Sequence, residues 1–395
     1  MAIDVDCVIV GGGVTGLMTA ARLAESGRRV RLIERDLLGA GATTSNHGLI
    51  HSGALYARWH PEIVAACRQA QLAYRSSFPD CLVAADPCWY FATSKTLHTY
   101  QTLWRSHDIV HHRVDPRDLS RVFRTEDRDI AACAIDEVVI DTRALLTVLV
   151  ARCIDRAVEV SVGLTAEKLL IDNGRVRGVG TGDGVVRARQ VVVCAGIGTR
   201  DLLDRAGSMI GAELASRLEM LTAYPGTLTR PVIGLEFGWP ALAPAAAAGT
   251  VLASRYGGVQ RTVQRRGRWP VPTAEAAALD RELTEWMAPG VIDHAEPVAW
   301  VCSKTEHTTR DQDQWGTSPN YTVIDHRQRE QIGGLWTVLP GKMTLALHAS
   351  RDVATAVTGQ TQPLGLAHGA RGDLDAAGEL VGISPWAAHQ EVQAQ

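Results

Sequence analysis

The stretch Val5-Asp-Cys-Val-Ile-Val-Gly-Gly-Gly-Val-Thr-Gly16 decides the fold of this chain. It opens with a nearly continuous apolar run, as expected of a short parallel strand that is buried on both faces. Glycines follow at once, and residues 14–26 then show the apolar spacing of a helix that Gly27 ends. A second strand is expected at residues 29–33, so the start of the chain predicts a β-α-β unit.

Three glycines of this turn each have a mechanical role in binding a dinucleotide. Gly11 permits the tight turn, Gly13 lets the backbone approach a pyrophosphate, and Gly16 allows the helix to pack closely on the strand. The exposed amides and the dipole of the helix start favour the negative charge of the diphosphate. Glu34 ends the second strand, where it can accept hydrogen bonds from ribose hydroxyls, and it argues against the 2′-phosphate of NADP.

Length and composition describe an ordinary globular enzyme. The chain has 395 residues, of which 46% are hydrophobic and 21% charged, with a formal net charge of −3. This balance gives no overall field that would favour nucleic acid or an anionic membrane. One basic run, residues 261–268, is interpreted as a solvated loop, with contact to an anionic ligand as the alternative.

Cysteine usage and the pattern of apolar segments indicate a location. The eight cysteines are scattered without a CxxC pair, so they are interpreted as buried thiols in a reducing compartment. The chain has no apolar stretch near the roughly 18 residues that would suggest a membrane span, and its start lacks the layout of a signal peptide. A cytoplasmic location is therefore expected.

The rest of the chain alternates helical and strand-like patterns. Helices are predicted over residues 61–77, 143–155 and 271–288, and a meander of short strands over residues 158–193. The alanine- and proline-rich segment 240–249 is predicted to be a surface loop. A final strand-turn-helix is predicted over residues 335–358.

Three patches, spread in order along the chain, resemble a known family. Gly39-Ala-Gly-Ala-Thr43 and Asn46-His-Gly-Leu-Ile-His-Ser-Gly53 are similar to segments of the D-amino-acid-oxidase-type FAD-dependent oxidoreductases. The likeness is greatest to the branch of glycerol-3-phosphate dehydrogenases and L-2-hydroxyglutarate oxidases. Val192-Val-Cys-Ala-Gly196 resembles the strand end beneath the adenine, and residues 333–344 resemble the loop that holds the flavin ring. The resemblance implies that FAD is the cofactor.

The same resemblance implies an α/β fold in which a Rossmann-like FAD-binding domain and a mixed-sheet α+β substrate domain are interleaved in sequence. The FAD-binding domain is expected at residues 1–85, 145–205 and 320–370, the substrate-binding domain at 86–144 and 206–319, and a tail at 371–395. The residues expected to contact FAD are Gly11, Gly13, Val14, Thr15, Gly16, Glu34, Arg35, Thr43, Thr44, Ser45, His47, Gly48, Leu49, Ala166, Ala195, Gly196, Pro340, Gly341, Lys342, Met343 and Thr344.

Catalysis is expected from His51, Tyr56, Arg255, Lys304 and Lys342. Substrate oxidation needs hydride transfer to flavin N5, a partner for the departing proton, and groups that orient the substrate. By resemblance, His51 lies along the flavin as a base or hydrogen-bond partner, with a core histidine satisfied by backbone as the alternative. Lys342 matches a lysine near flavin N1 and O2, where a cation stabilises the reduced ring.

Two departures from the glycerol-3-phosphate pattern concern the grip on the phosphate. Leu55 precedes Tyr56 where the family has an arginine, and Lys304 stands where the family has a second arginine. Lysine is a point charge and cannot offer the planar fork of arginine to a phosphate. Arg255 and Tyr256 are candidates to replace the missing arginine, with ordinary surface-strand residues as the alternative. These departures argue against glycerol 3-phosphate itself.

Three functions remain open at this point. The leading hypothesis is an FAD-dependent dehydrogenase or oxidase that converts a CH–OH group of a small polar substrate to a carbonyl, and an anionic substrate is considered. One alternative is an amine oxidase that acts on a CH–NH bond, as glycine and sarcosine oxidases do. Another is a redox-quiet FAD protein that serves as a scaffold in a larger complex. Covalent attachment of FAD to His47 is also open.

The electron acceptor and metal binding complete the expectations. Oxygen, a quinone or a partner protein could accept the electrons, and a quinone would place the protein at the periphery of a membrane. No metal site is expected. His107, His111 and His112 tempt a metal interpretation, but their polar stretch lacks a frame of carboxylates, so a solvated loop is predicted.

Overall fold

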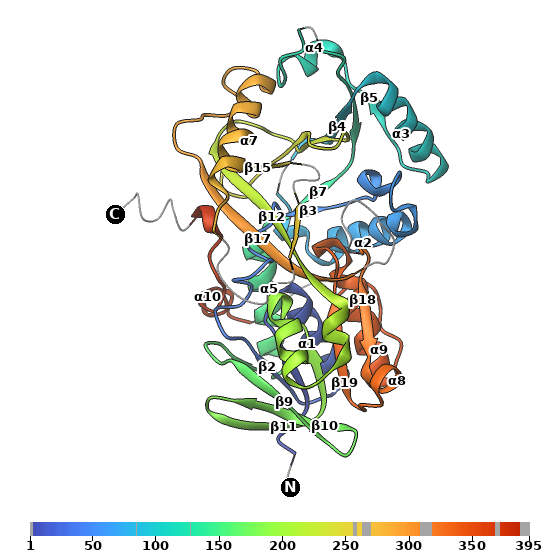
Figure 1. Ribbon diagram of the computed structural model, residues 1–395, viewed down its shortest axis with the longest axis vertical. Coiled ribbons are helices and arrows are strands. Elements are labelled where there is room, and N and C mark those ends of the chain that lie inside the picture. The colour runs from blue at the N-terminus through green and yellow to red at the C-terminus, as the bar shows by residue number, and fades with distance from the viewer. Residues whose placement is uncertain are drawn as a thin grey trace.

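Two large sheets organise the chain. The computed structural model describes residues 3–83, 85–126, 128–255, 259–262, 270–308, 318–367 and 372–387. An eight-stranded sheet occupies the lower half of Figure 1, and a nine-stranded sheet the upper half. Two long strands, β12 (Leu214–Pro225) and β17 (Val298–His307), run from the upper sheet toward the lower one. The α/β fold class is confirmed.

The first sheet contains the predicted β-α-β unit. β1 (Val5–Val10) pairs in parallel with β2 (Val30–Ile33) and β11 (Gly184–Val193), and α1 (Val14–Glu25) connects β1 to β2. The other strands of this sheet are β8 (Glu159–Ser161), β9 (Ala166–Asp172), β10 (Arg175–Thr181), β18 (Thr322–Asp325) and β19 (Leu335–Leu339). β9, β10 and β11 form an antiparallel meander, as predicted.

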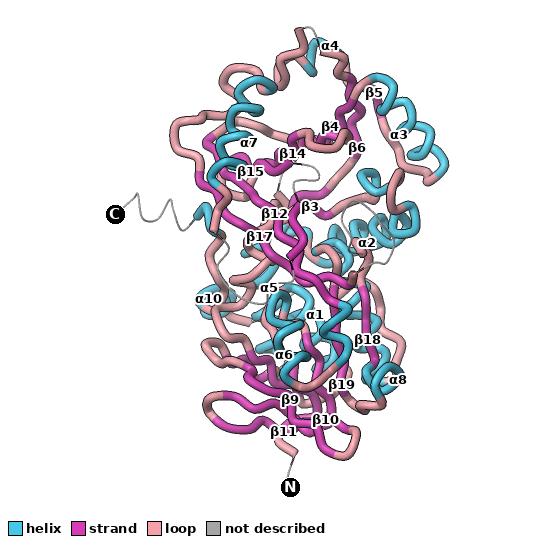
Figure 2. Tube along the Cα trace, in the orientation of Figure 1, coloured by secondary structure: helices cyan, strands magenta, loops and turns pink. Residues whose placement is uncertain are grey.

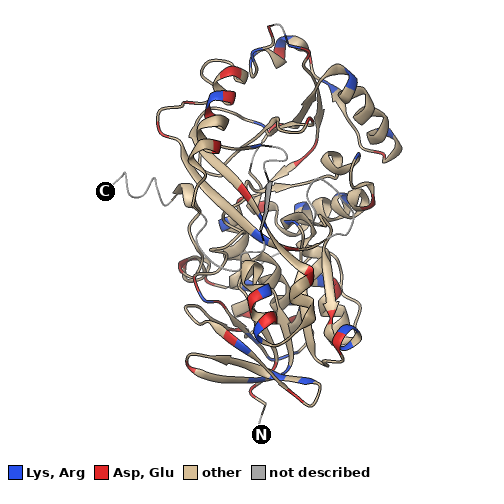
Figure 3. Cartoon of the chain, in the orientation of Figure 1, with Lys and Arg blue, Asp and Glu red and all other residues tan. Residues whose placement is uncertain are grey.

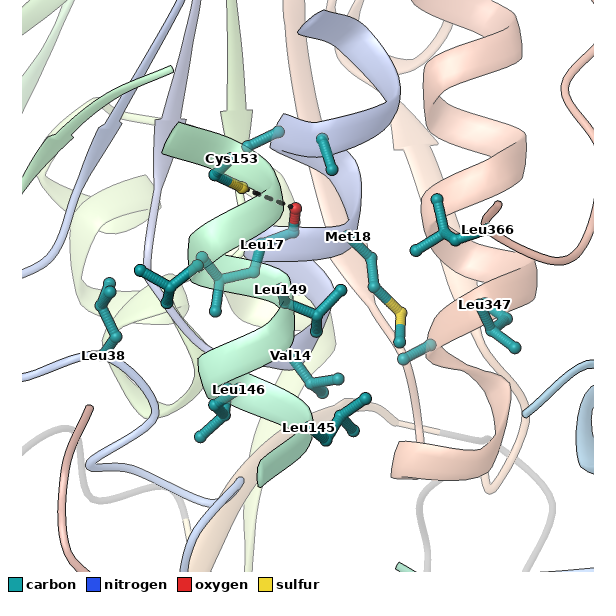
Figure 4. Close-up of a cluster of buried hydrophobic side chains, with 14 of the residues drawn as sticks. Val14, Leu17, Met18, Leu38, Leu145, Leu146, Leu149, Cys153, Leu347 and Leu366 are labelled. Carbon is teal, nitrogen blue, oxygen red and sulfur yellow. Dashed lines mark hydrogen bonds between the residues drawn. The ribbon is translucent and has the colours of Figure 1, made fainter. Parts of the chain in front are cut away.

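Three helices pack on one face of this sheet. They are α1, α5 (Thr142–Asp155) and α9 (Ala346–Thr358), and Figure 4 shows their side chains interleaved. Leu17 and Met18 of α1 are fully buried with Leu149 of α5 and Leu347 of α9. Burying each such side chain contributes about 1.5–3 kcal/mol, so the helix that follows the glycine turn is firmly seated.

The second sheet is mixed and is covered unequally on its two faces. Its strands, beside β12 and β17, are β4 (Cys88–Ala92), β5 (His112–Arg113), β6 (Ala131–Ile135), β13 (Val232–Gly234), β14 (Pro240–Pro244), β15 (Thr250–Arg255) and β16 (Val259–Thr262). α7 (Thr273–Trp286) covers one face through Leu279 and Leu283. The other face packs against α3 (Ser94–Ser106) and, along β12 and β17, faces the first sheet.

The remaining elements lie between and around the two sheets, and Figure 2 shows them among the loops. A small sheet pairs β3 (Leu49–Ile50) with β7 (Val138–Val139). The remaining helices are α2 (Val64–Ser77), α4 (Pro116–Leu119), α6 (Thr199–Arg205), α8 (His326–Glu330) and α10 (Leu374–Glu379). No helix in the described part of the chain is long and apolar enough to cross a membrane.

The segment after α10 returns to the first sheet. The carbonyl of Leu38 accepts a hydrogen bond from Gly382 N–H at 2.9 Å, and Leu38 N–H donates to the carbonyl of Leu380 at 2.9 Å. Further on, the ring of Trp386 lies 5.2 Å from the ring of Trp300 on β17. Residues 380–386 therefore tie the loop after β2 to the second sheet.

The structure corrects two local predictions. Residues 240–244 form the buried strand β14 between β13 and β15, where a surface loop was predicted. Alanine has low β propensity, so the strand pattern was masked. Within the predicted meander of short strands, residues 185–187 and 191–193 belong to one long strand, β11. Its first half pairs with β10 and its second half with β1 and β19.

Candidate active site

The turn between β1 and α1 is shaped by its glycines. Gly11 has a φ of +107°, and a Cβ there would collide with the carbonyl oxygen of Cys194. A Cβ on Gly16 would collide with the carbonyl oxygen of Gly11. At Gly13, among the described residues, a Cβ would meet only Thr43 Oγ1, at 3.2 Å. Protein packing thus excludes a side chain at Gly11 and at Gly16. At Gly13 a Cβ would meet only a side-chain oxygen in the described part of the chain, and the missing Cβ is what would let a pyrophosphate approach the helix start.

Glu34 is fixed at the end of β2 beside this turn. Its Oε2 accepts the N–H of Gly12 at 2.7 Å, and its Oε1 accepts the N–H of Asp36 at 3.0 Å. The carbonyl of Glu34 accepts the N–H of Leu164 at 2.9 Å, which brings the start of β9, with Ala166, to the same side. The acidic end of β2 therefore lies at the edge of the sheet where the nucleotide turn opens.

Three further predicted cofactor residues lie near this edge. Ala195 and Gly196 follow β11, whose next residue, Cys194, donates its N–H to the last carbonyl of β1 at 2.8 Å. Because β1 and β11 are parallel neighbours, their carboxyl ends meet beside the glycine turn. Arg35 carries an exposed guanidinium that pairs with Asp36 at 3.1 Å.

The segment from Thr43 to Leu49 folds over the start of α1. Thr43 Oγ1 accepts the N–H of Val14 at 3.2 Å. Asn46 then braces the segment from within, because its Nδ2 donates to the Thr43 carbonyl at 2.7 Å and its Oδ1 accepts the N–H of Gly48 at 2.8 Å. The predicted cofactor residues in this braced segment, besides those named, are Thr44, Ser45 and His47.

A second segment, residues 340–344, meets the continuation of the first one. Thr344 is fully buried, and its Oγ1 accepts the N–H of His51 at 3.0 Å. The hydroxyl of Tyr74 on α2 donates to the carbonyl of Met343 at 2.8 Å. Gly341 has a φ of +64° and no room for a side chain, since a Cβ would lie 2.5 Å from the carbonyl of Asn320. The predicted flavin segments are thus one unit in space.

Four of the five predicted catalytic side chains gather here. The rings of His51 and Tyr56 meet edge to face with centroids 5.3 Å apart, and Lys342 Nζ lies 4.2 Å from the Tyr56 ring centroid. Lys304 Nζ donates to the carbonyl of Gly341 at 2.6 Å. His51 Nδ1 is buried and has no hydrogen-bond partner among the described residues. The alternative of a core histidine whose ring is satisfied by backbone does not account for this nitrogen.

Three charged residues that sequence reasoning missed complete the cluster. β12 and β17 pair so that Arg217 lies opposite Lys304, and Glu219 opposite Cys302. The side chain of Glu306 is 0% exposed, and its Oε1 lies 2.8 Å from Lys304 Nζ and 3.5 Å from Arg217 Nη1. Figure 3 marks charges of both signs midway along the two long strands. On each strand the charged residues are two positions apart in the sequence. Residues at that spacing point to the same face of a sheet, so this pattern was the signal that the sequence offered.

Burial lowers the pKa values of the two central bases. It lowers the pKa of Lys342 from 10.5 to about 7; Cys67 opposes this shift and the Lys304 charge adds to it. Burial also lowers the pKa of His51 well below its ordinary 6.5, and His47 and Lys342 lower it further. His51 is therefore a neutral imidazole near pH 7, beside an ammonium that readily gives up its proton.

The pKa values of two neighbouring groups show how the cluster divides its charge. Burial lowers the pKa of His47, although the carboxylate of Glu219 acts in the opposite direction. Arg217 is also buried, which lowers its pKa, but Glu306 and then Glu219 outweigh that effect and raise the pKa above its ordinary value. The cluster therefore combines a permanent guanidinium with two neutral imidazoles.

Arg255, the fifth predicted catalytic residue, lies on the opposite face of the second sheet. Its Nη2 pairs with Glu282 of α7 at 2.5 Å. Ala253, on the same side of β15, packs with the α7 side chains, whereas Trp300 of β17 packs on the other face. Side chains alternate along a strand, so Lys304 shares the face of Trp300 and Arg255 does not. The structure separates Arg255 from the cluster, and the arginine in the cluster comes from β12.

Two sequence-based expectations fall partly or wholly beyond the described residues. Tyr256 lies outside them, as do the side chains of the basic run 261–268, so the solvated loop, with contact to an anionic ligand as the alternative, stays a prediction. Across the described ranges, no group of three or more His, Cys, Asp or Glu side chains could hold a metal ion.

Comparison with known sequences gives one match that covers most of the chain. Residues 6–332 match the family described as FAD dependent oxidoreductase (DAO). A 62-residue segment is 48% identical to a subunit of the anaerobic glycerol-3-phosphate dehydrogenase of Escherichia coli, covering 16% of this chain and 11% of the relative. A 56-residue segment is 45% identical to a probable FAD-dependent oxidoreductase of Pseudomonas aeruginosa, covering 14% of each. The first of these matches thus spans about a tenth of the length of the dehydrogenase relative.

Comparison with solved structures extends over nearly the whole chain. NikD, described as an unusual amino acid oxidase essential for nikkomycin biosynthesis, aligns with a TM-score of 0.72 and 17% identity over 97% of this chain and 98% of its own. Glycine oxidase from Geobacillus kaustophilus aligns with a TM-score of 0.69 and 18% identity over 94% and 97%. L-amino acid deaminase from Proteus vulgaris gives 0.71 and 14% over 92% and 95%. At these identities the likeness concerns the fold.

Proposed function

We propose that this chain, which belongs to the FAD dependent oxidoreductase (DAO) family, oxidises a CH–OH group of a small anionic substrate to a carbonyl. The observation that carries the proposal is the buried Nδ1 of His51, which has no partner among the described residues. An alcohol must lose its hydroxyl proton as its carbon loses a hydride, so it needs a base at hand. A neutral imidazole with an uncommitted nitrogen is suited to that task.

The residues of the chain fit FAD. At Gly13, among the described residues, only Thr43 Oγ1 would meet a Cβ, and the carboxylate of Glu34 lies at the neighbouring strand end. We infer that the nucleotide half binds there, and that residues 43–49 and 340–344 hold the flavin ring. When bound, FAD supplies the acceptor for the hydride.

Arg217 and Lys304 bind the anionic group of the substrate. They lie side by side on paired strands, and Glu306 holds both through contacts of 3.5 and 2.8 Å. Glu306 contacts both cations and Glu219 also acts on Arg217, so an anion would be held chiefly by the directed hydrogen bonds of the guanidinium. The guanidinium can meet a carboxylate or phosphate with two parallel hydrogen bonds, which the lysine predicted at this place cannot do by itself.

Lys342 and Tyr56 orient the opposite side of the site. Lys342 Nζ donates to the carbonyl of Pro319 at 2.5 Å and lies over the Tyr56 ring, so its direction is set by two neighbours. A buried ammonium is worth more to a developing negative charge than one in water. Its pKa of about 7 lets this ammonium hold or release its proton near neutral pH.

Oxidation of a CH–NH bond is the second candidate, and Glu219 is the observation that favours it. This carboxylate lies close enough to His47 to influence its pKa, on the face shared with Arg217. An amino acid would place its ammonium toward such a carboxylate and its carboxylate toward the arginine. Both proposals therefore use the same site for the anionic group of the substrate. They differ in the residue that meets the reacting group, which is His51 for a hydroxyl and Glu219 for an ammonium.

Anaerobic bleaching of the bound flavin tests the proposal. Purified protein is mixed with panels of hydroxy acids, polyol phosphates, neutral sugars and amines, and absorbance in the visible flavin band is followed. We expect an anionic alcohol to bleach the flavin and its neutral counterpart to fail. Bleaching by amines alone would replace the alcohol proposal with the amine one, and no bleaching by any compound would support a scaffold role.

The electron acceptor is tested in the second half of the reaction. The reduced protein is mixed with oxygen or with a soluble quinone, and the rate of return of the absorbance is compared. A protein that is reoxidised only by quinone would act at the membrane surface. A protein that neither reagent reoxidises would need a partner protein.

A further inference from the structure

Glu137 is a buried carboxylate that lies outside the cation cluster. It stands between β6 and β7, is 7% exposed, and accepts three short hydrogen bonds. Its Oε2 accepts the N–H of Ser52, and its Oε1 accepts the hydroxyls of Ser52 and Tyr90, all at 2.6 Å. Gln71 Nε2 donates to Oε2 at 3.4 Å. A carboxylate that is bound on both oxygens by four neutral donors is held in one orientation.

These donors come from three separate elements. Ser52 directly follows His51, Tyr90 lies on β4 in the second sheet, and Gln71 lies on α2. The same Gln71 amide also donates to the carbonyl of Ile50 at 3.4 Å, on the other side of His51. Glu137 therefore joins the histidine segment to the second sheet and to the helix that supports residue 343.

The position of His51 depends on its neighbours because its own ring has few polar contacts. The backbone N–H bonds to Thr344, but Nδ1 has no partner in the described part of the chain. Before His51, the pairing of β3 with β7 fixes the chain. After it, Ser52 donates two hydrogen bonds to Glu137. Gly53 then has a φ of +102°, and a Cβ there would lie 2.8 Å from the carbonyl oxygen of Val64.

We propose that Glu137 is a positioning residue that sets the place of His51 against the flavin segment 340–344. The inference rests on the proposed function only where it treats His51 as the base. The flavin itself follows from the family, so a failure of the alcohol proposal would leave the readouts below intact.

The first experiment compares Glu137→Ala and Glu137→Gln with the wild-type holoprotein. The measurements are the dissociation constant of FAD and the visible-region circular dichroism of the bound flavin, which reports groups packed on the ring. We expect Glu137→Ala to weaken FAD on the order of tenfold and to change the dichroism, because buried donors lose their acceptor. Glu137→Gln should recover most of both, since its oxygen accepts the Ser52 N–H and the hydroxyls can rotate to accept its amide.

Glu330→Ala is the matched control. Glu330 is also buried, and it accepts the Ser208 hydroxyl at 2.8 Å and the Met209 N–H at 2.5 Å, but it lies at α8. This variant should lower the melting temperature and leave the flavin dichroism unchanged. If Glu137→Ala behaves in the same way, with wild-type FAD affinity and dichroism, Glu137 is only structural and the proposal is wrong.

Two milder variants keep the test open if Glu137→Ala does not fold. Ser52→Ala and Tyr90→Phe each remove one hydroxyl donor and retain the carboxylate. Both should shift the flavin dichroism in the same direction as Glu137→Ala, but by a smaller amount. With a substrate in hand, Tyr90→Phe should lower kcat more than it changes KM, because it displaces a base and not the anion site. Folded variants with wild-type dichroism and wild-type kcat would overturn the proposal.

Discussion

Two regions of this protein are built in different ways: the nucleotide turn between β1 and α1, and the charged cluster of β12, β17 and Lys342, which is the proposed substrate face. In the turn, Gly16 packs on the backbone of Gly11, Gly11 packs on the backbone of Cys194, and the N–H of Gly12 bonds to Glu34 at the end of β2. On the substrate face, Arg217, Glu306 and Lys342 come from distant segments and meet through buried charges. The first region is specified by steric exclusion and the second by electrostatic partnership, so the two should respond differently to substitution and to pH.

The largest effect is expected on the chemical step of the substrate face. His51→Asn should slow anaerobic flavin reduction by the best alcohol about 10²–10⁴-fold, because a positioned base is lost. FAD content should stay close to that of the wild type. His348→Asn is the control, since this buried imidazole is bound to the carbonyl of Ala66 at 3.0 Å. Equal slowing by both variants would remove His51 from the reaction.

The next effect should break the nucleotide turn. Gly16→Ala places a methyl group against the backbone of Gly11, which cannot move without disturbing the turn. We expect a cost of about 3 kcal/mol or more, seen as roughly a hundredfold weaker FAD binding by fluorescence titration. Gly182→Ala, whose methyl would meet only Glu167 Oε1 at 3.8 Å, should leave FAD binding unchanged. Wild-type affinity in Gly16→Ala would refute the steric account of the turn.

A smaller effect should distinguish the two faces of the second sheet. Arg217→Met removes the planar guanidinium and should raise KM for an anionic substrate about tenfold or more, with FAD content retained. Arg255→Met removes an equal charge from the α7 face and should leave KM unchanged. The comparison is made by steady-state kinetics on protein matched for flavin content. A KM that rises only in Arg255→Met would reverse the assignment.

The smallest effect concerns the pH dependence of stability that the buried carboxyl group of Glu137 causes. Burial raises the pKa of Glu137 from 4.5 to about 7, although hydrogen bonds from Ser52 and Tyr90 lower it and Asp136 adds to the rise. The folded state then binds more protons than the unfolded state between those pH values, so this group costs stability as pH rises from about 4.5 to about 7. Relative to Glu137→Gln, the wild type should lose at least about 1 kcal/mol across that window, measured by urea unfolding.

Glu330→Gln supplies a control of opposite sign for that measurement. Hydrogen bonds from His326 and Ser208 lower the pKa of Glu330 in spite of its burial. Its contribution to stability is therefore present above the ordinary pKa of 4.5 and is lost as pH falls through the lower folded value. The free energy of unfolding is compared between the wild type and each Gln variant as pH rises. If this difference changes in the same direction for both substitutions, the electrostatic description of Glu137 is wrong.

The difference between the regions also explains what the sequence could predict. The strand, glycine turn, helix and Glu34 follow one another, so local steric rules were sufficient to place them. The contact of His51 with Thr344 depended on family resemblance, since the two residues are far apart along the chain. Arg217 and Glu306 were missed because their importance arises from the register of β12 with β17, and register is set by the whole sheet.

Arg255 illustrates the same limit from the other side. It was a reasonable candidate because it is an arginine on a strand of the substrate domain, but strand residues alternate between faces. Placing it required the packing of Ala253 against α7, which no local pattern reveals. The domain ranges and cofactor contacts predicted from the resemblance stay predictions that a complex with bound FAD would test.

The return of residues 380–386 to the first sheet has a consequence for biosynthesis. The loop after β2 is completed only when Leu38 bonds to Leu380 and Gly382, and Gly39 in turn donates its N–H to the carbonyl of Gly12 at 2.9 Å. On the ribosome, β1, α1 and β2 emerge long before residues 380–382, which are the partners of this loop. Contacts of such high sequence separation form late. Nascent chains should therefore acquire flavin only after residue 382 has emerged, and a ribosome stalled before residue 380 should carry a folded core with little cofactor.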